Sequence, residues 1–149
     1  AITDLDGVKA IGREVREKGF SALKTNIFTY EPGGKNPKGY RPGFGVPAQP
    51  ALNVERDVLA NIVMHLEAMR DGACPGVDLL IDLNFNAKTE GYLKILRAIR
   101  DLDAFPAADL GVLVALADAN GRRPTEAEAR RRAEPWRPYR GVATMHLWS

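Results

Sequence analysis

The stretch Val77-Asp-Leu-Leu-Ile-Asp-Leu-Asn84 is an almost continuous apolar run that acidic residues interrupt, and Pro75-Gly76 comes just before it. Such a run is typical of a strand that is buried on both faces, which is the usual state of a strand in a parallel sheet. Asp82 and Asn84 stand at its carboxyl end, where ligands collect in parallel α/β folds. This stretch therefore predicts a parallel sheet with a polar strand end.

The residues before this run have the periodicity of one more helix and one more strand. Apolar side chains three and four positions apart predict a helix over residues 4–18, and Gly19 follows as a stop. The apolar and β-branched residues 20–28 then predict a strand. A helix, a glycine and a strand make up half of an α/β unit.

The segments around the central run continue the same pattern. Residues 31–50 are dense in proline and glycine, so we expect a long loop there. Asn53 is expected to cap a helix that runs to about Arg70, and residues 89–100 are expected to be helical. The order helix, strand, loop, helix, strand, helix is the repeating unit of α/β proteins.

After Asp103 the pattern changes to helices alone. Residues 109–119 are expected to form a helix, and Thr125-Glu-Ala-Glu128 has the form of a capping box before an arginine-rich helix. No strand is expected after about residue 84. The sequence therefore predicts two parts, an α/β segment over residues 1–102 and an all-α tail over residues 103–149.

Composition limits the classes of protein to consider. The chain has 149 residues, of which 45% are hydrophobic and 27% charged, a globular balance with a formal charge of only +2. Seven arginines against three glutamates lie between Gly121 and Arg140 and form a local basic stripe. The single cysteine, Cys74, cannot form an internal disulfide, and no apolar run has the form of a membrane span or a signal peptide. We expect a cytoplasmic protein that does not contact a membrane.

Polar side chains at the ends of the two expected strands are candidates for chemistry. Asp82 offers carboxylate oxygens that suit Mg²⁺, although a carboxylate there can also cap the next helix. Lys24 and Asn26 alternate on the first strand, so both point to one face. They lie either at a solvent-exposed strand end or where an ammonium and an amide hold a substrate carboxylate.

The α/β segment resembles a known enzyme family. The resemblance covers about two-thirds of the chain and is to acid-sugar dehydratase-like members of the mandelate racemase and muconate-lactonizing branch of the enolase superfamily. It is carried by four stretches of sequence, Gly19-Phe-Ser-Ala-Leu-Lys-Thr-Asn26, Arg41-Pro-Gly-Phe-Gly-Val-Pro47, Asp78-Leu-Leu-Ile-Asp-Leu-Asn84 and Asn86-Ala-Lys-Thr-Glu-Gly-Tyr-Leu-Lys94. It implies the fold class α/β, as a partial (β/α)8-barrel-like segment with parallel strands that an all-α tail follows.

The resemblance also implies a chemistry. In that family Mg²⁺ stabilises the enediolate that forms when a base removes the proton α to a carboxylate. Asp82 matches the first of three metal-binding acids, Lys24 matches the first lysine of a Lys-x-Lys motif, and Asn26 stands where the second lysine, often the base, is found. Asn84 is assigned to substrate binding. The two further acids and a later histidine are missing, so we expect weak or no Mg²⁺ binding and little dehydratase activity from this chain alone.

The tail resembles a second, unrelated family, the C-terminal part of alkyl-base DNA glycosylases of the helix-hairpin-helix superfamily. The stretches that carry this resemblance are residues 103–111 and residues 133–148, which include Trp136-Arg-Pro-Tyr-Arg140. It implies that Asp109 is the catalytic carboxylate at a flipped damaged base, and Arg137 and Arg140 could contact DNA phosphates. Without the resemblance, Asp109 is simply a helix N-cap.

Three hypotheses about function therefore remain open. The chain is a fragment of a Mg²⁺-dependent dehydratase-like enzyme that acts on a sugar acid, a fragment of a 3-methyladenine-type glycosylase that acts on alkylated DNA, or a non-catalytic chimeric protein. Two parallel strands have open edges, which other copies or the tail helices could cover. We expect either coverage of these edges by the tail or a homo-oligomer.

Overall fold

The α/β segment contains two small sheets and three helices. The computed structural model describes residues 2–102, 110–137, 139–140, 143 and 147. In chain order, the elements of the segment are α1 (Leu5–Glu17), β1 (Ala22–Thr25), β2 (Phe28–Glu31), β3 (Lys35–Gly39), the 3-10 turn η1 (Pro42–Phe44), α2 (Arg56–Ala73), β4 (Asp78–Ile81), α3 (Thr89–Ala98) and the 3-10 turn η2 (Arg100–Leu102). The tail contributes α4 (Leu110–Ala115), α5 (Glu126–Ala133) and the 3-10 turn η3 (Glu134–Trp136).

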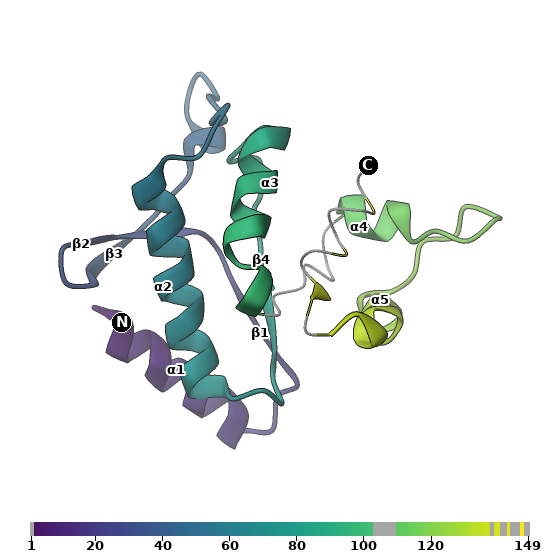
Figure 1. Ribbon diagram of the computed structural model, residues 1–149, viewed down its shortest axis with the longest axis horizontal. Coiled ribbons are helices and arrows are strands. Elements are labelled where there is room, and N and C mark those ends of the chain that lie inside the picture. The colour runs from purple at the N-terminus through teal and green to yellow at the C-terminus, as the bar shows by residue number, and fades with distance from the viewer. Residues whose placement is uncertain (1, 103–109, 138, 141–142, 144–146, 148–149) are drawn as a thin grey trace.

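The two strands that the sequence predicted to be parallel do pair in parallel. β1 lies beside β4 with Ala22 opposite Asp78 and Thr25 opposite Ile81 (Figure 1). Along β4 the side chains alternate between the two faces of the sheet. Leu79 and Ile81 join the main core with α2 and α3, whereas Leu80 belongs to a second, smaller core. The fold class is confirmed as a partial barrel-like α/β segment with a helical tail.

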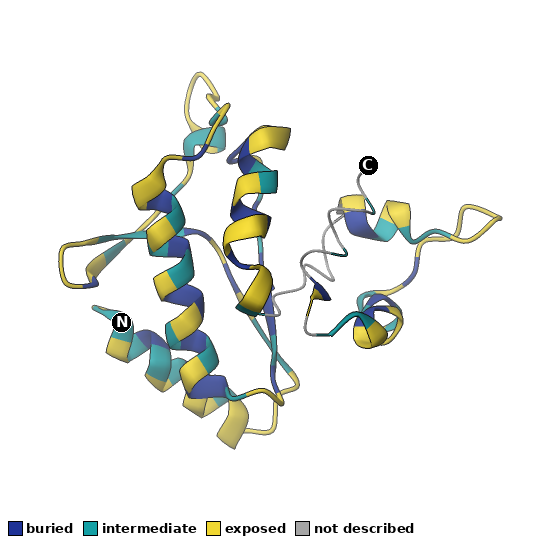
Figure 2. Ribbon diagram, in the orientation of Figure 1, coloured by how far each residue is buried: buried dark blue, intermediate teal, exposed yellow. Residues whose placement is uncertain are grey.

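The main core lies between the sheet and helices α1, α2 and α3, and the buried positions follow the inner face of α2 (Figure 2). Helices α1 and α2 cross with backbone against backbone. A Cβ added to Gly72 would lie 2.0 Å from the carbonyl oxygen of Lys9, and one added to Gly12 would lie 2.6 Å from that of Met69. Glycine at both positions therefore sets the distance between the two helices.

The second core joins the tail to the other face of the sheet. Its buried members are Leu80, Val112, Ala129 and Ala133, and Ala22 and Trp136 pack against it. The tail thus covers a face of the sheet. The sequence predicted that the tail could cover an open strand edge, and no described contact places it there. Among the described residues, β1 and β4 pair only with each other, and oligomerisation through their edges stays a prediction.

Three local predictions were wrong. The expected strand over residues 20–28 is two strands, because the chain turns after Thr25 and β2 pairs antiparallel with β3 instead of extending β1. The expected loop over residues 31–50 contains β3, since Gly33 and Gly34 adopt positive φ and close a hairpin. Asn53 does not cap α2, which begins after Glu55, and Val54 between them is buried in the main core.

Other local predictions were confirmed. The helix predicted over residues 4–18 is α1, and the helix predicted over residues 89–100 is α3. Thr125 and Glu128 form the predicted capping box at the start of α5. Among the described residues, no helix is both long and apolar enough to cross a membrane.

Candidate functional site

The polar side chains that the sequence placed at the strand ends do meet in the structure. Lys24 and Asn26 are both exposed, and Thr25 between them is buried, so the two point to the same face, as predicted. Asp82 follows β4 directly, and its backbone N–H donates to the carbonyl of Thr25 at 2.8 Å. Because the strands are parallel, Asp82 comes to lie beside the end of β1.

Two contacts connect the site across the two strands. The Lys24 Nζ lies 2.8 Å from Oδ2 of Asp82, with both side chains partly open to solvent. The side-chain amide of Asn84 donates to Oδ1 of Asn26 at 3.1 Å. Asp82, Asn84, Lys24 and Asn26 therefore form one cluster, which we call the strand-end cluster.

The donor atoms of this cluster suit a hard divalent cation as part of its ligand set. Asp82 supplies a carboxylate oxygen and Asn26 an amide oxygen, the ligand types that Mg²⁺ prefers. The Lys24 ammonium on Oδ2 shows that this oxygen already attracts a positive charge. Among the described residues there is no group of three or more His, Cys, Asp and Glu side chains that could hold a metal ion. The cluster thus fits a metal through one carboxylate only.

A small cavity lies next to the cluster. It has a volume of about 210 Å³, and Lys24, Thr25 and Asn26 form part of its wall. Most of the remaining wall is apolar, and His65 also reaches it. Sequence reasoning assigned His65 an ordinary structural role, and its contacts are of that kind: Nε2 lies 2.8 Å from the Thr25 hydroxyl and Nδ1 lies 2.5 Å from the Tyr30 hydroxyl.

His65 is expected to make the protein less stable in mild acid. Burial lowers the pKa of His65 from its ordinary value to about 4. Because the folded state resists protonation of His65, the neutral imidazole contributes its full stability above a pH of about 6.5. This contribution is lost as pH falls toward 4, by about 3 kcal/mol in total. Urea unfolding followed across this pH range measures the change.

The control for this prediction is His65→Gln, which keeps polar atoms in the ring's place but does not titrate. Its unfolding free energy should vary much less between pH 6.5 and 4. Asp78, Asp118 and Glu128 have lowered pKa values, so their stabilising effects disappear mainly below that range. Equal slopes for the wild type and the glutamine variant would show that His65 is not the group responsible.

The tail arginines assigned to DNA lie elsewhere and have other partners. Arg140 is fully buried, and its Nη2 lies 2.9 Å from Oδ1 of Asp78 at the start of β4. Arg137 forms ion pairs with the same carboxylate and with Glu134. In this structure both guanidinium groups hold the tail to the sheet through Asp78, and their contact with DNA phosphates stays a prediction. Asp109 lies outside the described residues.

These two arginines lower the pKa of Asp78. Burial raises the pKa of Asp78, but the hydrogen bond and charge of Arg140, followed by those of Arg137, outweigh burial and hold the pKa below its ordinary value. The carboxylate therefore stays ionised and shared between two cations. Sequence reasoning did not single out Asp78, because its partners are 59 and 62 residues away.

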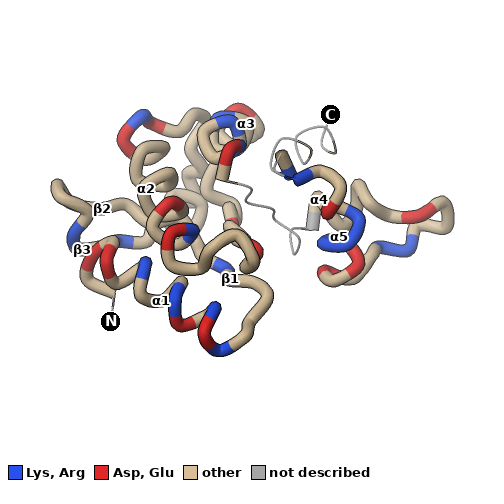
Figure 3. Tube along the Cα trace, turned by 60° about the horizontal axis from the view of Figure 1, so that its bottom comes forward, with Lys and Arg blue, Asp and Glu red and all other residues tan. Residues whose placement is uncertain are grey.

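Most arginines of the basic stripe form ion pairs or hydrogen bonds within the protein. Arg122 pairs with Asp118 and Glu128, and Arg130 pairs with Glu126. Figure 3 shows basic and acidic segments next to each other around α5. The tail thus presents mixed charge there, which favours a solvated helix over a phosphate-binding surface.

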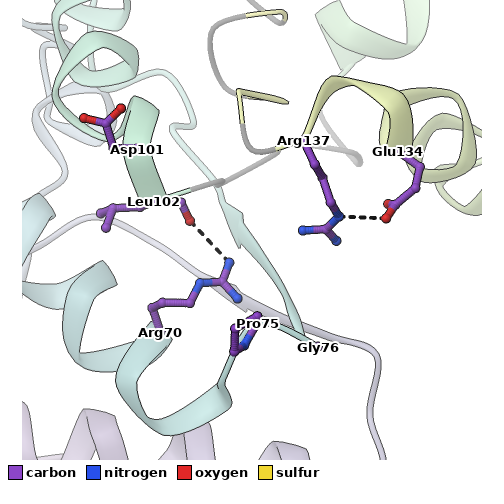
Figure 4. A pocket seen from close by; sticks show the side chains of 7 residues that line it. All are labelled: Arg70, Pro75, Gly76, Asp101, Leu102, Glu134 and Arg137. Atoms are coloured by element: carbon purple, nitrogen blue, oxygen red, sulfur yellow. Dashed lines mark hydrogen bonds and ion pairs between the residues drawn. The ribbon is translucent and has the colours of Figure 1, made fainter.

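A larger cavity lies between the α/β segment and the tail, and the arginines that line it have partners within the protein. It has a volume of about 520 Å³, and Arg70, Leu102, Glu134 and Arg137 are among the residues that line it (Figure 4). Arg70 donates to the carbonyl oxygens of Cys74, Val77 and Leu102, so its guanidinium braces the backbone at this end of the sheet. With Glu134 beside Arg137, this cavity has no cationic excess that would select an anion.

Comparison with known proteins finds similarity for part of the chain. No family model matches, and no curated protein matches. Two crystal structures from Burkholderia xenovorans do, of an enzyme provisionally named an L-alanine-DL-glutamate epimerase, one of them bound to magnesium and fumarate. Each aligns with 70% of this chain at 60% identity and a TM-score of 0.63, and neither is a DNA glycosylase.

The chain spans about a quarter of the length of these enzymes, 25% of one crystallised chain and 26% of the other. The similarity supports the enolase-superfamily part of the sequence resemblance and bears on nothing in the glycosylase part. The α/β segment is thus similar to a part of these enzymes, one structure of which is bound to magnesium.

Proposed function

We propose that the strand-end cluster is part of the active site of a Mg²⁺-dependent enzyme that removes a proton α to a carboxylate. The observation that carries this proposal is the convergence of Lys24, Asp82 and Asn84 at the carboxyl ends of two parallel strands. That end of a parallel sheet is where α/β enzymes bind their ligands. The magnesium in a structure 60% identical to this chain supports the same assignment.

Each residue of the cluster has a distinct role in the proposal. Asp82 would hold the divalent cation, which would supply positive charge where a substrate carboxylate binds. Lys24 leaves Asp82 when the substrate binds, and its ammonium then neutralises the other side of the substrate carboxylate. Asn84 and Asn26 supply amide groups that orient polar atoms of the substrate. An enzyme of this kind needs further acidic ligands beyond those that the described residues provide.

The same proton removal can lead to either of two reactions, dehydration of a sugar acid or inversion of configuration at the α-carbon. Inversion needs one group to take the proton on one face and another to return a proton on the opposite face. Asn26 carries an amide, which is not a base, and Lys24 is the ionisable group on this strand face. Dehydration needs a base on one face of the α-carbon only, and a group outside the strand-end cluster would supply it. The lack of a base at Asn26 therefore favours dehydration, with sugar acids as substrates, over the epimerisation named for the similar enzyme.

The proposed metal role of Asp82 is tested by Mn²⁺ binding, followed by electron paramagnetic resonance of the free ion. We expect weak binding that Asp82→Asn abolishes, because the only carboxylate of the cluster is lost. Lys24→Met should instead strengthen binding, by about threefold to tenfold, since an ammonium no longer competes for Oδ2.

Asp101→Asn is the matched control, because Asp101 is an exposed aspartate that also pairs with one basic residue, Arg100. It should leave Mn²⁺ binding unchanged. If Asp82→Asn and Asp101→Asn reduce binding equally, or if neither reduces it, the metal role of Asp82 is wrong.

A further inference from the structure

The chain makes a tight turn immediately after β4, and Asn84 is at its centre. The φ angle of Asn84 is 49°, in the left-handed region that asparagine tolerates better than most residues do. Its backbone N–H donates to Oδ1 of Asp82 at 3.0 Å, and its side-chain amide reaches Asn26. The turn thus binds one of the two carboxylate oxygens of Asp82 and leaves Oδ2 to face Lys24.

A hydroxyl group from α3 holds this turn in place. The Tyr92 phenol donates to the carbonyl oxygen of Asn84 at 2.5 Å. Helix α3 is itself fixed closely, because a Cβ on Gly91 would lie 2.8 Å from that of Ala87 and 3.1 Å from a methyl group of Val54. Ile95 on the same helix is fully buried. The phenol therefore reaches the turn from a rigid element.

We propose that Tyr92 is a positioning residue that sets the orientation of the Asp82 carboxylate through Asn84. Tyr92 holds the peptide of Asn84 in its left-handed conformation, and the N–H of that residue then fixes Oδ1, so that Asp82 offers a cation the single oxygen Oδ2. This inference rests on the proposed metal role of Asp82 for its function, but the positioning itself does not need a metal. Loss of a group that orients a metal ligand in this way typically costs about 10- to 100-fold in metal affinity.

The test compares Tyr92→Phe with Tyr30→Phe. Each variant removes the hydroxyl of a half-buried tyrosine, and each hydroxyl takes part in a hydrogen bond of 2.5 Å. The hydroxyl of Tyr30 contacts His65 and not the strand-end cluster. Both variants should lower the unfolding midpoint to a similar degree. Three-bond NMR couplings report the χ1 rotamer of Asp82 directly: we expect one rotamer in the wild type and in Tyr30→Phe, and an average over rotamers in Tyr92→Phe.

Mn²⁺ binding is the second readout. Tyr92→Phe should weaken it by about tenfold, the lower end of what the loss of an orienting partner costs, and Tyr30→Phe should not change it. A single Asp82 rotamer in Tyr92→Phe overturns the inference whether or not metal binds. Averaged rotamers in a protein whose wild type binds no Mn²⁺ would confirm the positioning and refute the proposed function instead.

Discussion

Replacing Asp78 with asparagine is expected to destabilise the protein by about 3 kcal/mol or more and to release the tail from the sheet. Asp78 is the shared anion of Arg137 and Arg140, and Arg140 has no exposed surface. The variant removes from this buried guanidinium the carboxylate that lies 2.9 Å away, whereas the Glu134 carboxylate lies at 3.9 Å. Urea unfolding and the rate of trypsin cleavage in α5 measure the two effects.

Arg140→Met is the informative counterpart of this variant. It removes a cation but leaves Asp78 paired with Arg137, and it fills the same space with an apolar side chain. The loss should therefore be smaller, about 1 to 2 kcal/mol. Equal and small losses in both variants would mean that these ion pairs do not hold the tail on the sheet.

The second large effect is expected at the crossing of α1 and α2. Gly72→Ala places a Cβ only 2.0 Å from the Lys9 carbonyl oxygen, a backbone atom that cannot move aside by changing rotamer. The helices must separate, and the main core loses contacts along α1, at a net cost of about 3 kcal/mol after the gain in helix propensity. Thermal unfolding by circular dichroism measures this.

Gly76→Ala is the matched control for the helix crossing. A Cβ at Gly76 has no atom within 4 Å, so its substitution should change the unfolding temperature little. A similar, small shift for Gly72→Ala would show that the two helices are not in backbone contact in solution.

Much of the α/β segment could be predicted because its signals are local. Leu79 and Ile81 lie in an apolar run bounded by Pro75-Gly76, and this was enough to predict a parallel strand with Asp82 at its end. The alternation of Lys24 and Asn26 likewise predicted that they share a face. Periodicity of two or 3.6 residues depends only on backbone geometry, so a sequence shows it directly.

The wrong predictions concern elements that distant residues decide. The predicted strand over residues 20–28 is divided because β2 pairs with β3. The proline and glycine content of residues 31–50 had predicted a loop where β3 lies. The ion pair of Arg140 was also beyond local prediction, because Asp78 lies 62 residues away in sequence, and contact of Arg140 with DNA phosphates stays a prediction. Tyr92 had no distinguishing signal beyond its place in a predicted helix.

The sequence by itself determined the helices α1 and α3, the parallel pair of β1 and β4, and the residue types at the strand ends. Only the tertiary structure decided which face of the sheet the tail covers, which carboxylate its arginines bind, and how Asn84 and Tyr92 orient Asp82. The physical reason is that hydrophobic periodicity acts over a few neighbouring residues, whereas ion pairs, close backbone contacts and hydrogen bonds join residues that folding alone brings together.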